Sequence, residues 1–311
     1  MRVLIVGAAG MIGRKLAGRL RASGTLRGEA IARLVLADAV EPADLVTDLS
    51  EPGVADELVA ERPDVIFHLA AVVSGEAEAD FEKGYRVNLD GMRSLLEAVR
   101  AAAYAPRLVF TSSIAVFGPP LPDMIGDDHA LTPATSYGTQ KAIAELLLDD
   151  YSRRGFVDGV GIRLPTICVR PGAPNRAASG FFSSIIREPL NGEEAVLPVP
   201  DTVRHWFASP RTAVEFLIHA AELGSAALDT RRCLTMPGLS ATVADEIEAL
   251  RRVGGDGAVG LIRREPDETI AQMVESWPGG FDARRARELG FRAEGSFDEI
   301  VQVYVEDELA A

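Results

Sequence analysis

Residues 3–13 read Val-Leu-Ile-Val-Gly-Ala-Ala-Gly-Met-Ile-Gly, and this stretch decides the fold. Its first four residues form a continuous apolar run, which is typical of a strand buried on both faces of a parallel sheet. An amphipathic segment at 11–20 predicts a helix. The intervening G-x-x-G-x-x-G spacing allows a tight turn and lets a pyrophosphate approach the helix N-terminus. We therefore expect a dinucleotide site formed by Gly7, Gly10, Met11, Ile12 and Gly13.

A carboxylate after the next apolar run indicates which dinucleotide binds. Residues 34–37 are apolar and end at Asp38, 25 residues after Gly13. This is close to the place of the acid that hydrogen-bonds the adenosine ribose hydroxyls, and such an acid repels a 2′-phosphate. Because Ala39 rather than an arginine comes next, the sequence favours NAD over NADP. An aspartate that only caps the loop is the alternative.

Asp48 and Leu49 follow the next short segment of the chain. We expect them to approach the adenine ring of the same cofactor. A solvated loop acid is an alternative for Asp48 with nearly equal support, because aspartates are mostly exposed.

Strands and helices alternate over about the first 165 residues. Further apolar runs predict strands at 34–37, 65–71, 107–111 and 160–164. Helical spacing of apolar residues predicts helices at 88–103 and 136–151. Such alternation means stacked βαβ units with helices on both faces of a parallel sheet. The expected fold class is α/β, a Rossmann-like doubly wound parallel sheet.

The rhythm changes near Val169, where prolines divide the chain into short pieces. Helical patterns return at 212–223, 242–253 and 282–289. We interpret residues 1–168 as the NAD-binding domain that carries the reactive side chains. Residues 169–311 are then mainly a smaller C-terminal substrate-binding lobe, interleaved with late strands and helices of the first domain.

The composition excludes several classes of function. The chain has 311 residues, and its net charge of −14 argues against a nucleic acid or an anionic membrane as partner. Its two cysteines, Cys168 and Cys233, are too few for a disulfide scaffold or a thiolate metal site. No apolar run approaches the roughly 18 residues of a membrane span. Glycines interrupt the apolar start, and no convincing signal-peptide cleavage site follows. We expect a cytoplasmic protein without a metal ion.

A serine, a tyrosine and a lysine complete a candidate catalytic site. Ser112 and Ser113 leave the carboxyl end of the strand at 107–111, the edge that carries ligands in doubly wound sheets. Tyr137 and Lys141 are four residues apart on a predicted helix and can share one site. A lysine ammonium favours the phenolate and lowers the tyrosine pKa from about 10, which makes the tyrosine a base near neutral pH. A core tyrosine beside a surface lysine is the alternative.

These motifs together resemble the extended short-chain dehydrogenase/reductase family, and the resemblance covers essentially the whole chain. It is carried by residues 7–13, the His68-Leu69-Ala70-Ala71 stretch, Ser113, and the segment from Tyr137 to Lys141. The resemblance implies that Tyr137 is the catalytic base or acid and that Lys141 tunes its pKa and binds ribose. Ser113 is implied as the donor that orients the substrate hydroxyl.

The resemblance also implies further contacts and an assembly. The cofactor contacts that it implies are Leu69, Ala70, Ala71, Asn88, Pro165 and Thr166. Members of this family often form homodimers through the helices that correspond to 88–103 and 136–151, and we expect a homodimer here.

Departures from the family patterns narrow the activity. Ile114-Ala115 replaces the acid pair of nucleotide-sugar 4,6-dehydratases, so water elimination lacks its second acid/base. The Tyr-Gly-Pro of many nucleotide-sugar epimerases is missing from 164–172. The segment 170–182, with Trp277-Pro278 and the tail at 281–286, resembles a subgroup that oxidises D-erythronate, a four-carbon sugar acid, at its 2-hydroxyl.

A short anionic substrate needs a guanidinium, which binds a carboxylate through two parallel hydrogen bonds. Arg204 and Arg176 are the leading candidates, followed by Arg170, and a surface arginine is the alternative for each. Cys168 lies in an apolar run and is interpreted as a buried structural thiol. His68 is interpreted as a satisfied core or supporting histidine.

The sequence thus predicts an NAD-dependent enzyme that oxidises a small sugar acid to its 2-oxo acid by hydride transfer. The alternatives are a uronate-type or other sugar-acid dehydrogenase and a nucleotide-sugar epimerase that uses the same three residues. A catalytically silent NAD-binding sensor is disfavoured, because such relatives commonly lose the tyrosine or the lysine.

Overall fold

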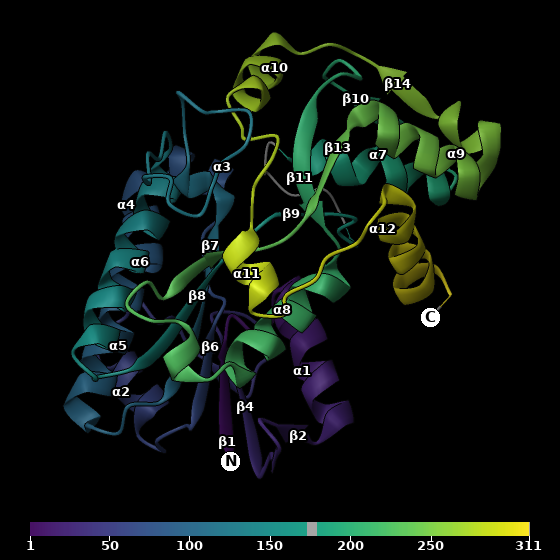
Figure 1. Cartoon of the computed structure of the whole chain (residues 1–311). Helices are drawn as coiled ribbons and strands as arrows, with labels where there is room; N and C mark the ends of the chain where they lie inside the picture. Colours follow the sequence, from purple (N-terminus) through teal and green to yellow (C-terminus); the bar gives the residue numbers. More distant parts are fainter. Residues whose placement is uncertain (173–178, 311) are drawn as a thin grey trace. The chain divides into compact units, whose positions relative to one another are not determined.

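A parallel sheet forms the centre of the first part of the chain (Figure 1). The computed structural model describes residues 1–172 and 179–310. Within them, seven strands form one sheet in the order β5-β4-β1-β6-β7-β8-β12, and all neighbouring strands are parallel. Their bounds are β1 (Arg2–Val6), β4 (Arg33–Asp38), β5 (Leu45–Val46), β6 (Val65–His68), β7 (Arg107–Ser113), β8 (Asp158–Leu164) and β12 (Cys233–Thr235). The strand order reverses at β1, as in a Rossmann-like sheet, which confirms the predicted fold class.

The strands form at the predicted apolar runs. The side chains of Val3, Leu4 and Ile5 are at most 1% exposed, as expected for strands covered on both faces. The third run was predicted to continue to residue 71, but β6 ends at His68. The chain turns there because the next two backbone N–H groups both donate to the carbonyl of Val6.

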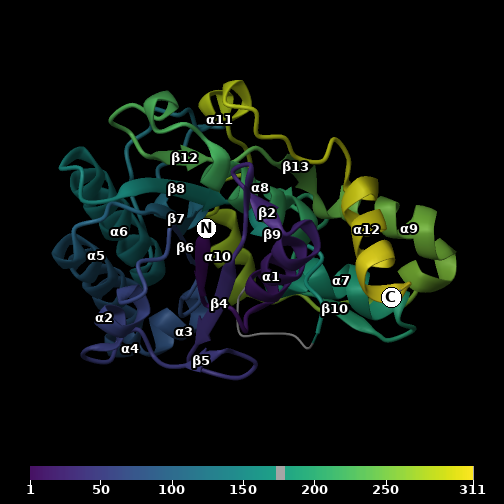
Figure 2. The same ribbon diagram turned by 90° about the horizontal axis from the view of Figure 1, so that it is seen from below.

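Helices cover both faces of this sheet (Figures 1 and 2). One face carries α2 (Val54–Val59), α5 (Gly91–Ala102) and α6 (Ser136–Arg153), whose apolar residues share one core cluster with β1, β6 and β7. On the opposite face, α1 (Met11–Ser23) contacts β1 and β4. An ion pair joins α1 to α8 (Pro210–Glu222), which lies on the same face. The doubly wound arrangement is therefore confirmed.

Smaller elements connect these layers. A hairpin of β2 and β3 follows α1, and two short helices lead through a π-helical turn into α5. Their bounds are β2 (Thr25–Leu26), β3 (Glu29–Ala30), α3 (Ser74–Ala79), α4 (Phe81–Tyr85) and the turn Arg86–Asp90.

The chain divides into two units that are interleaved in sequence. Unit 1 comprises Met1–Val116, Pro133–Leu164 and Val214–Met236, and it contains the seven-stranded sheet. Unit 2 comprises Phe117–Thr132, Pro165–Ala213 and Pro237–Ala311. The predicted roles of residues 1–168 in cofactor binding and 169–311 in substrate binding stay predictions.

Unit 2 is built from short elements around its own core. A three-stranded sheet has the order β13-β11-β9, and β10 pairs with β14. The bounds are β9 (Thr166–Ile167), β10 (Ala195–Leu197), β11 (Arg204–Ala208), β13 (Leu239–Thr242), β14 (Ile262–Arg264), α7 (Gly180–Leu190), α9 (Val243–Val259), α10 (Glu268–Glu275), α11 (Arg284–Glu288) and α12 (Phe297–Tyr304). In residues 1–172 and 179–310, no helix has the length and apolar character needed to cross a membrane.

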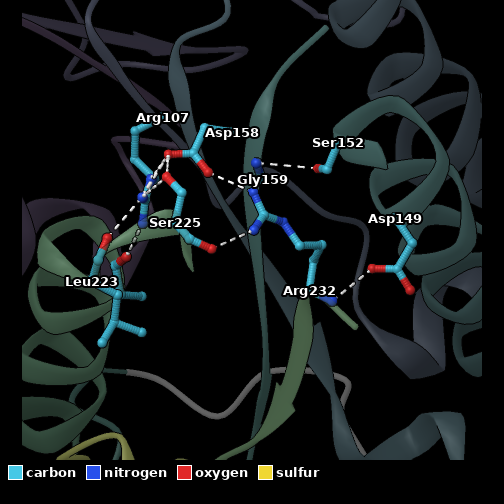
Figure 3. A network of polar contacts seen from close by, with 9 residues as sticks. Arg107, Asp149, Ser152, Asp158, Gly159, Leu223, Ser225 and Arg232 are labelled. Atoms are coloured by element: carbon cyan, nitrogen blue, oxygen red, sulfur yellow. Dashed lines mark hydrogen bonds and ion pairs between the residues drawn. The ribbon is translucent and has the colours of Figure 1, made fainter. Parts of the chain in front are cut away.

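Arg107 connects the amino-terminal ends of two strands of the unit 1 sheet to the end of α8 (Figure 3). Arg107 and Asp158 begin β7 and β8, and they are paired in register. The buried guanidinium donates to the Asp158 carboxylate at 2.6 and 3.0 Å. It also donates to the carbonyls of Ala220 and Leu223, which lie at the end of α8, at 2.9 and 2.7 Å. Arg232 donates to the other Asp158 oxygen at 2.6 Å. One carboxylate thus joins β7, β8 and the segment that enters β12.

We expect Arg107→Met to lower the free energy of unfolding by about 1–3 kcal/mol, because it leaves two helix-end carbonyls without their donor and the Asp158 carboxylate with Arg232 as its remaining guanidinium partner. Denaturant unfolding measures this effect. Arg153→Met is the matched control, because it removes an i,i+3 ion pair whose side chains are 62% and 58% exposed, and it should change the midpoint little. Equal midpoints for both variants would contradict the assigned role of Arg107.

Candidate active site

The glycine loop lies between β1 and α1 and packs against the chain that follows β6. Gly7 has a φ of +90°, and a Cβ atom there would overlap the backbone nitrogen of Ala70. Only glycine meets both conditions. Gly10 is the N-cap residue of α1. Within the described residues, no side chain caps this end of α1, and the first turn of the helix contains no acidic residue. Its first N–H groups, at Met11, Ile12 and Gly13, can therefore receive an anion, so the loop fits a pyrophosphate.

Asp38 ends β4 and reaches the glycine loop. Its Oδ2 accepts a hydrogen bond from the Ala9 N–H at 2.8 Å, and its Oδ1 accepts one from the Val40 N–H at 3.3 Å. The carboxylate therefore caps the loop, as the alternative interpretation held, and its side chain stays partly exposed at that edge of the sheet. A carboxylate that caps the loop in this way can still contact a ribose hydroxyl at its exposed side.

Five further predicted cofactor residues follow β5 and β6, and their environments differ. Leu69, Ala70 and Ala71 follow β6 at the edge of the glycine loop and are partly exposed. Asp48 accepts from the N–H and the hydroxyl of Ser50, at 2.9 and 2.7 Å, and so closes a turn. Leu49 is 6% exposed and packs into the core. An adenine contact at these two positions stays a prediction.

Asn88 is buried and joins two parts of unit 1. Its amide oxygen accepts from the Val72 N–H at 2.8 Å. Its amide nitrogen donates to the Val72 carbonyl at 3.0 Å and to Gln140 Oε1 at 2.7 Å. Asn88 thus connects the chain after β6 with α6, one residue before Lys141.

Gly138 brings the start of α6 against the segment after β7. A Cβ atom at Gly138 would overlap the Ala115 carbonyl, so only glycine permits this approach. Thr135 caps the helix by accepting from the Gly138 N–H at 3.0 Å. Ser113 is the last residue of β7, and its hydroxyl accepts from the Ala115 N–H at 3.2 Å. The segments that carry Ser113 and Tyr137 are therefore held together.

Lys141 is buried beneath Tyr137. Its side chain is 1% exposed, and Nζ donates to the Thr111 carbonyl at 2.8 Å. Nζ lies 5.7 Å from the centroid of the Tyr137 ring. Burial lowers the pKa of Lys141 to about 7, while the charge of Glu145 acts in the opposite direction. The alternative of a surface lysine is wrong, and the arrangement suits a lysine that tunes a partly buried phenol.

Sequence reasoning missed Glu145 and Arg163, which lie behind this lysine. The Arg163 guanidinium forms a two-pronged ion pair with the buried Glu145 carboxylate, with contacts of 2.8 to 3.1 Å. Ser112 donates its hydroxyl to the same carboxylate, so Ser112 and Ser113 have separate roles. The position of Glu145 four residues after Lys141, and an arginine inside the apolar run at 160–164, were the available signals.

His68 is buried next to Phe110, as a core histidine would be, with ring centroids 5.8 Å apart. It is not hydrogen-bonded as we expected, because neither ring nitrogen has a partner within the described chain. Burial and the charge of Lys141 lower its pKa to about 3, so the ring is neutral. Cys168 is a buried thiol whose pKa is raised by that burial.

The remaining candidates belong to unit 2. Pro165 is buried, and Thr166 shares a hydrogen bond of 2.7 Å with His205 Nε2. Arg204 begins β11, is exposed, and donates to the carbonyl and hydroxyl of Ser240 at 3.3 and 3.4 Å. Arg170 is more engaged and donates to the Ile167 carbonyl at 2.9 Å. Arg176 lies outside the described residues.

The side chains of the described residues and the family of the chain both bear on the chemistry of the site. Among residues 1–172 and 179–310, no group of three His, Cys, Asp or Glu side chains could hold a metal ion. The chain matches the model of the NAD dependent epimerase/dehydratase family over residues 3–226.

Relatives with known names cover nearly the whole chain. D-erythronate dehydrogenase of Cupriavidus necator is 50% identical, over 99% of this chain and 98% of that protein. D-erythronate dehydrogenase of Haemophilus influenzae is 44% identical, over 98% and 99%. A crystal structure described as a nucleoside-diphosphate-sugar epimerase from Agrobacterium tumefaciens is 62% identical, with a TM-score of 0.97 over 100% of this chain and 95% of that chain.

Proposed function

The chain belongs to the NAD dependent epimerase/dehydratase family, and from this premise we propose that it oxidises the 2-hydroxyl of D-erythronate, or of a closely similar small sugar acid, to a 2-oxo acid. The observation that carries the proposal is the buried Lys141, whose ammonium lies 5.7 Å from the Tyr137 ring in a chain 50% identical to a D-erythronate dehydrogenase. A dehydrogenase needs such a base for the hydroxyl proton.

Each of the three side chains has a defined part in this reaction. The Tyr137 phenolate accepts the hydroxyl proton of the substrate, and the Lys141 ammonium stabilises the phenolate. The Ser113 hydroxyl donates to the substrate oxygen as this oxygen becomes a carbonyl. NAD, when bound, supplies the acceptor for the hydride that leaves the same carbon.

The residues of unit 1 fit NAD as the cofactor. The open N–H groups at the start of α1 would hold the pyrophosphate, and the Asp38 carboxylate would bind the ribose hydroxyls while repelling a 2′-phosphate. The proposal includes a cytoplasmic homodimer formed through α5 and α6.

Arg204 is proposed as the ligand of the substrate carboxylate. Its guanidinium is exposed and donates to Ser240 through two long hydrogen bonds of 3.3 and 3.4 Å, so it can turn to an anion at little cost. The guanidinium of Arg170 already donates to the Ile167 carbonyl and to Ser179. A nucleotide-sugar epimerase is the second candidate function, because the Agrobacterium tumefaciens protein described as such is 62% identical.

Purified protein should reduce NAD with D-erythronate, and Tyr137→Phe should lower kcat by about 10²–10⁴-fold while NAD affinity largely survives, because only the phenol oxygen is lost. Steady-state NADH formation gives the rate, and a fluorescence titration gives the cofactor affinity. Uronates and UDP-sugars complete the substrate panel. Epimerisation of a UDP-sugar without oxidation of any sugar acid would favour the second candidate.

Asp38→Ala should remove the preference of the enzyme for NAD over NADP, because the carboxylate that repels the 2′-phosphate is gone. The ratio of kcat/KM values for the two cofactors measures this preference. Asp38→Asn is the matched control for loop structure, since it keeps an oxygen that can accept from the Ala9 N–H. A wild-type enzyme that prefers NADP would show that Asp38 does not have the assigned role.

Arg204→Ala should raise KM for the sugar acid by an amount equivalent to about 2–5 kcal/mol and leave NAD affinity unchanged, because a desolvated carboxylate loses its charged partner. Arg204→Lys should recover only part of this, since lysine lacks the two-pronged geometry. Arg251→Ala, which removes an exposed arginine of α9, is the control. An unchanged KM would leave Arg176 as the next candidate.

A further inference from the structure

Four ionisable side chains form a stripe along α6. Tyr137, Lys141, Glu145 and Asp149 follow one another at intervals of four residues, so they lie on the same side of the helix. Lys141 and Glu145 are 1% and 2% exposed. The proposed function uses the first two members of this stripe and leaves Glu145 unexplained.

The Glu145 carboxylate is fully engaged, but not with the lysine. The guanidinium of Arg163, on β8, donates to both carboxylate oxygens at 2.8 to 3.1 Å. Ser112, on β7, donates to Oε1. A further bond of 3.3 Å anchors the Arg163 guanidinium to Thr235 on β12. Three neighbouring strands therefore fix the carboxylate one helical turn from Lys141, which is about 6 Å along the axis.

Lys141 faces neutral groups on its other sides. On β7 it meets the Thr111 carbonyl and the Phe110 ring, whose centroid is 4.7 Å from Nζ. On β6 it faces His68, which is neutral because burial and the charge of the lysine lower the pKa of the imidazole to about 3. The charge of Glu145 raises the pKa of Lys141, against the lowering effect of burial.

We propose that Glu145 and Arg163 are positioning residues for the Tyr137–Lys141 pair. Arg163 compensates the charge of the carboxylate that lies one helical turn from the ammonium. Lys141 therefore keeps its hydrogen bond to the Thr111 carbonyl. An uncompensated carboxylate at this place would attract the ammonium, and an uncompensated guanidinium would repel it. This inference rests on the proposed roles of Tyr137 and Lys141.

Glu145→Gln tests the inference because it leaves the positive charge of Arg163 uncompensated. A more positive surrounding favours loss of a proton, so the apparent pKa at which the Tyr137 phenolate forms should fall by about one unit. Phenolate absorbance is measured against pH in the full-length protein and in the same protein carrying Tyr137→Phe. Their difference isolates Tyr137 among the five tyrosines and needs no substrate.

Two further variants separate charge from structure. The double variant Glu145→Gln/Arg163→Gln removes both charges, and its phenolate should form near the wild-type pH even though the ion pair is lost. Asp149→Asn removes the same charge from the same stripe about 12 Å from Lys141 along the axis, so it should shift the titration less. Equal titration curves for Glu145→Gln and Asp149→Asn would overturn the inference.

If Glu145→Gln does not fold, Arg163→Gln is measured instead. It leaves a carboxylate uncompensated, so the apparent pKa should rise, and an unchanged or lower value would contradict the inference. The pH profile of kcat/KM for D-erythronate should move with the phenolate titration. If the titration shifts as expected but no sugar acid is oxidised, the proposed function fails and the inference about Glu145 and Arg163 stands.

Discussion

Removing a lysine ammonium from water costs free energy unless oxygen atoms or negative charges surround it, and unit 1 is organised around one such group. Lys141 is 1% exposed and donates to the Thr111 carbonyl. Gly138 permits this by letting α6 rest on the segment after β7, and Asn88 ties α6 to the chain after β6 through Gln140. The proposed site around Tyr137 and Lys141 is therefore fixed largely by contacts with the backbone, which suits a reaction that needs well-placed proton acceptors.

The same constraint operates along the whole sheet. Buried ion pairs add little net stability, because desolvation offsets their attraction, yet removing one partner leaves a costly charge. Two ion pairs of unit 1 keep both partners together and so avoid this cost: Glu145 with Arg163, and Asp158 with Arg107. Each pair joins elements that are distant in sequence. A slip of β7 against β8 by one residue would separate Arg107 from Asp158 and turn its side chain to the other face, so this pair also fixes the register of the strands.

Local signals explain which parts of the structure could be predicted. A buried parallel strand needs a continuous apolar run, so the run at 3–6 predicted β1 directly. Tyr137 and Lys141 were found because the spacing of four residues is itself local. Arg163 was missed because its partner lies 18 residues away on another element, and a charge inside an apolar run does not indicate its partner. The small sheets of unit 2 were missed for the same reason, since β9 pairs with β11 and β10 with β14 across long intervals.

The three side chains proposed as catalytic do not distinguish a dehydrogenase from an epimerase, because both reactions remove the proton of a hydroxyl group and a hydride from the carbon that bears it. The distinction lies in how the substrate is held. A chain of net charge −14 attracts neither a sugar acid nor a nucleotide sugar at long range, so any anion must be bound by a guanidinium at short range. A carboxylate carries a single negative charge, which one guanidinium such as that of Arg204 can match with two parallel hydrogen bonds. A nucleoside diphosphate carries at least two negative charges on its phosphates and needs a larger basic surface. The proposed contact with Arg204, whose exposed guanidinium donates to Ser240 at 3.3 and 3.4 Å, fits the smaller anion and therefore the dehydrogenase proposal.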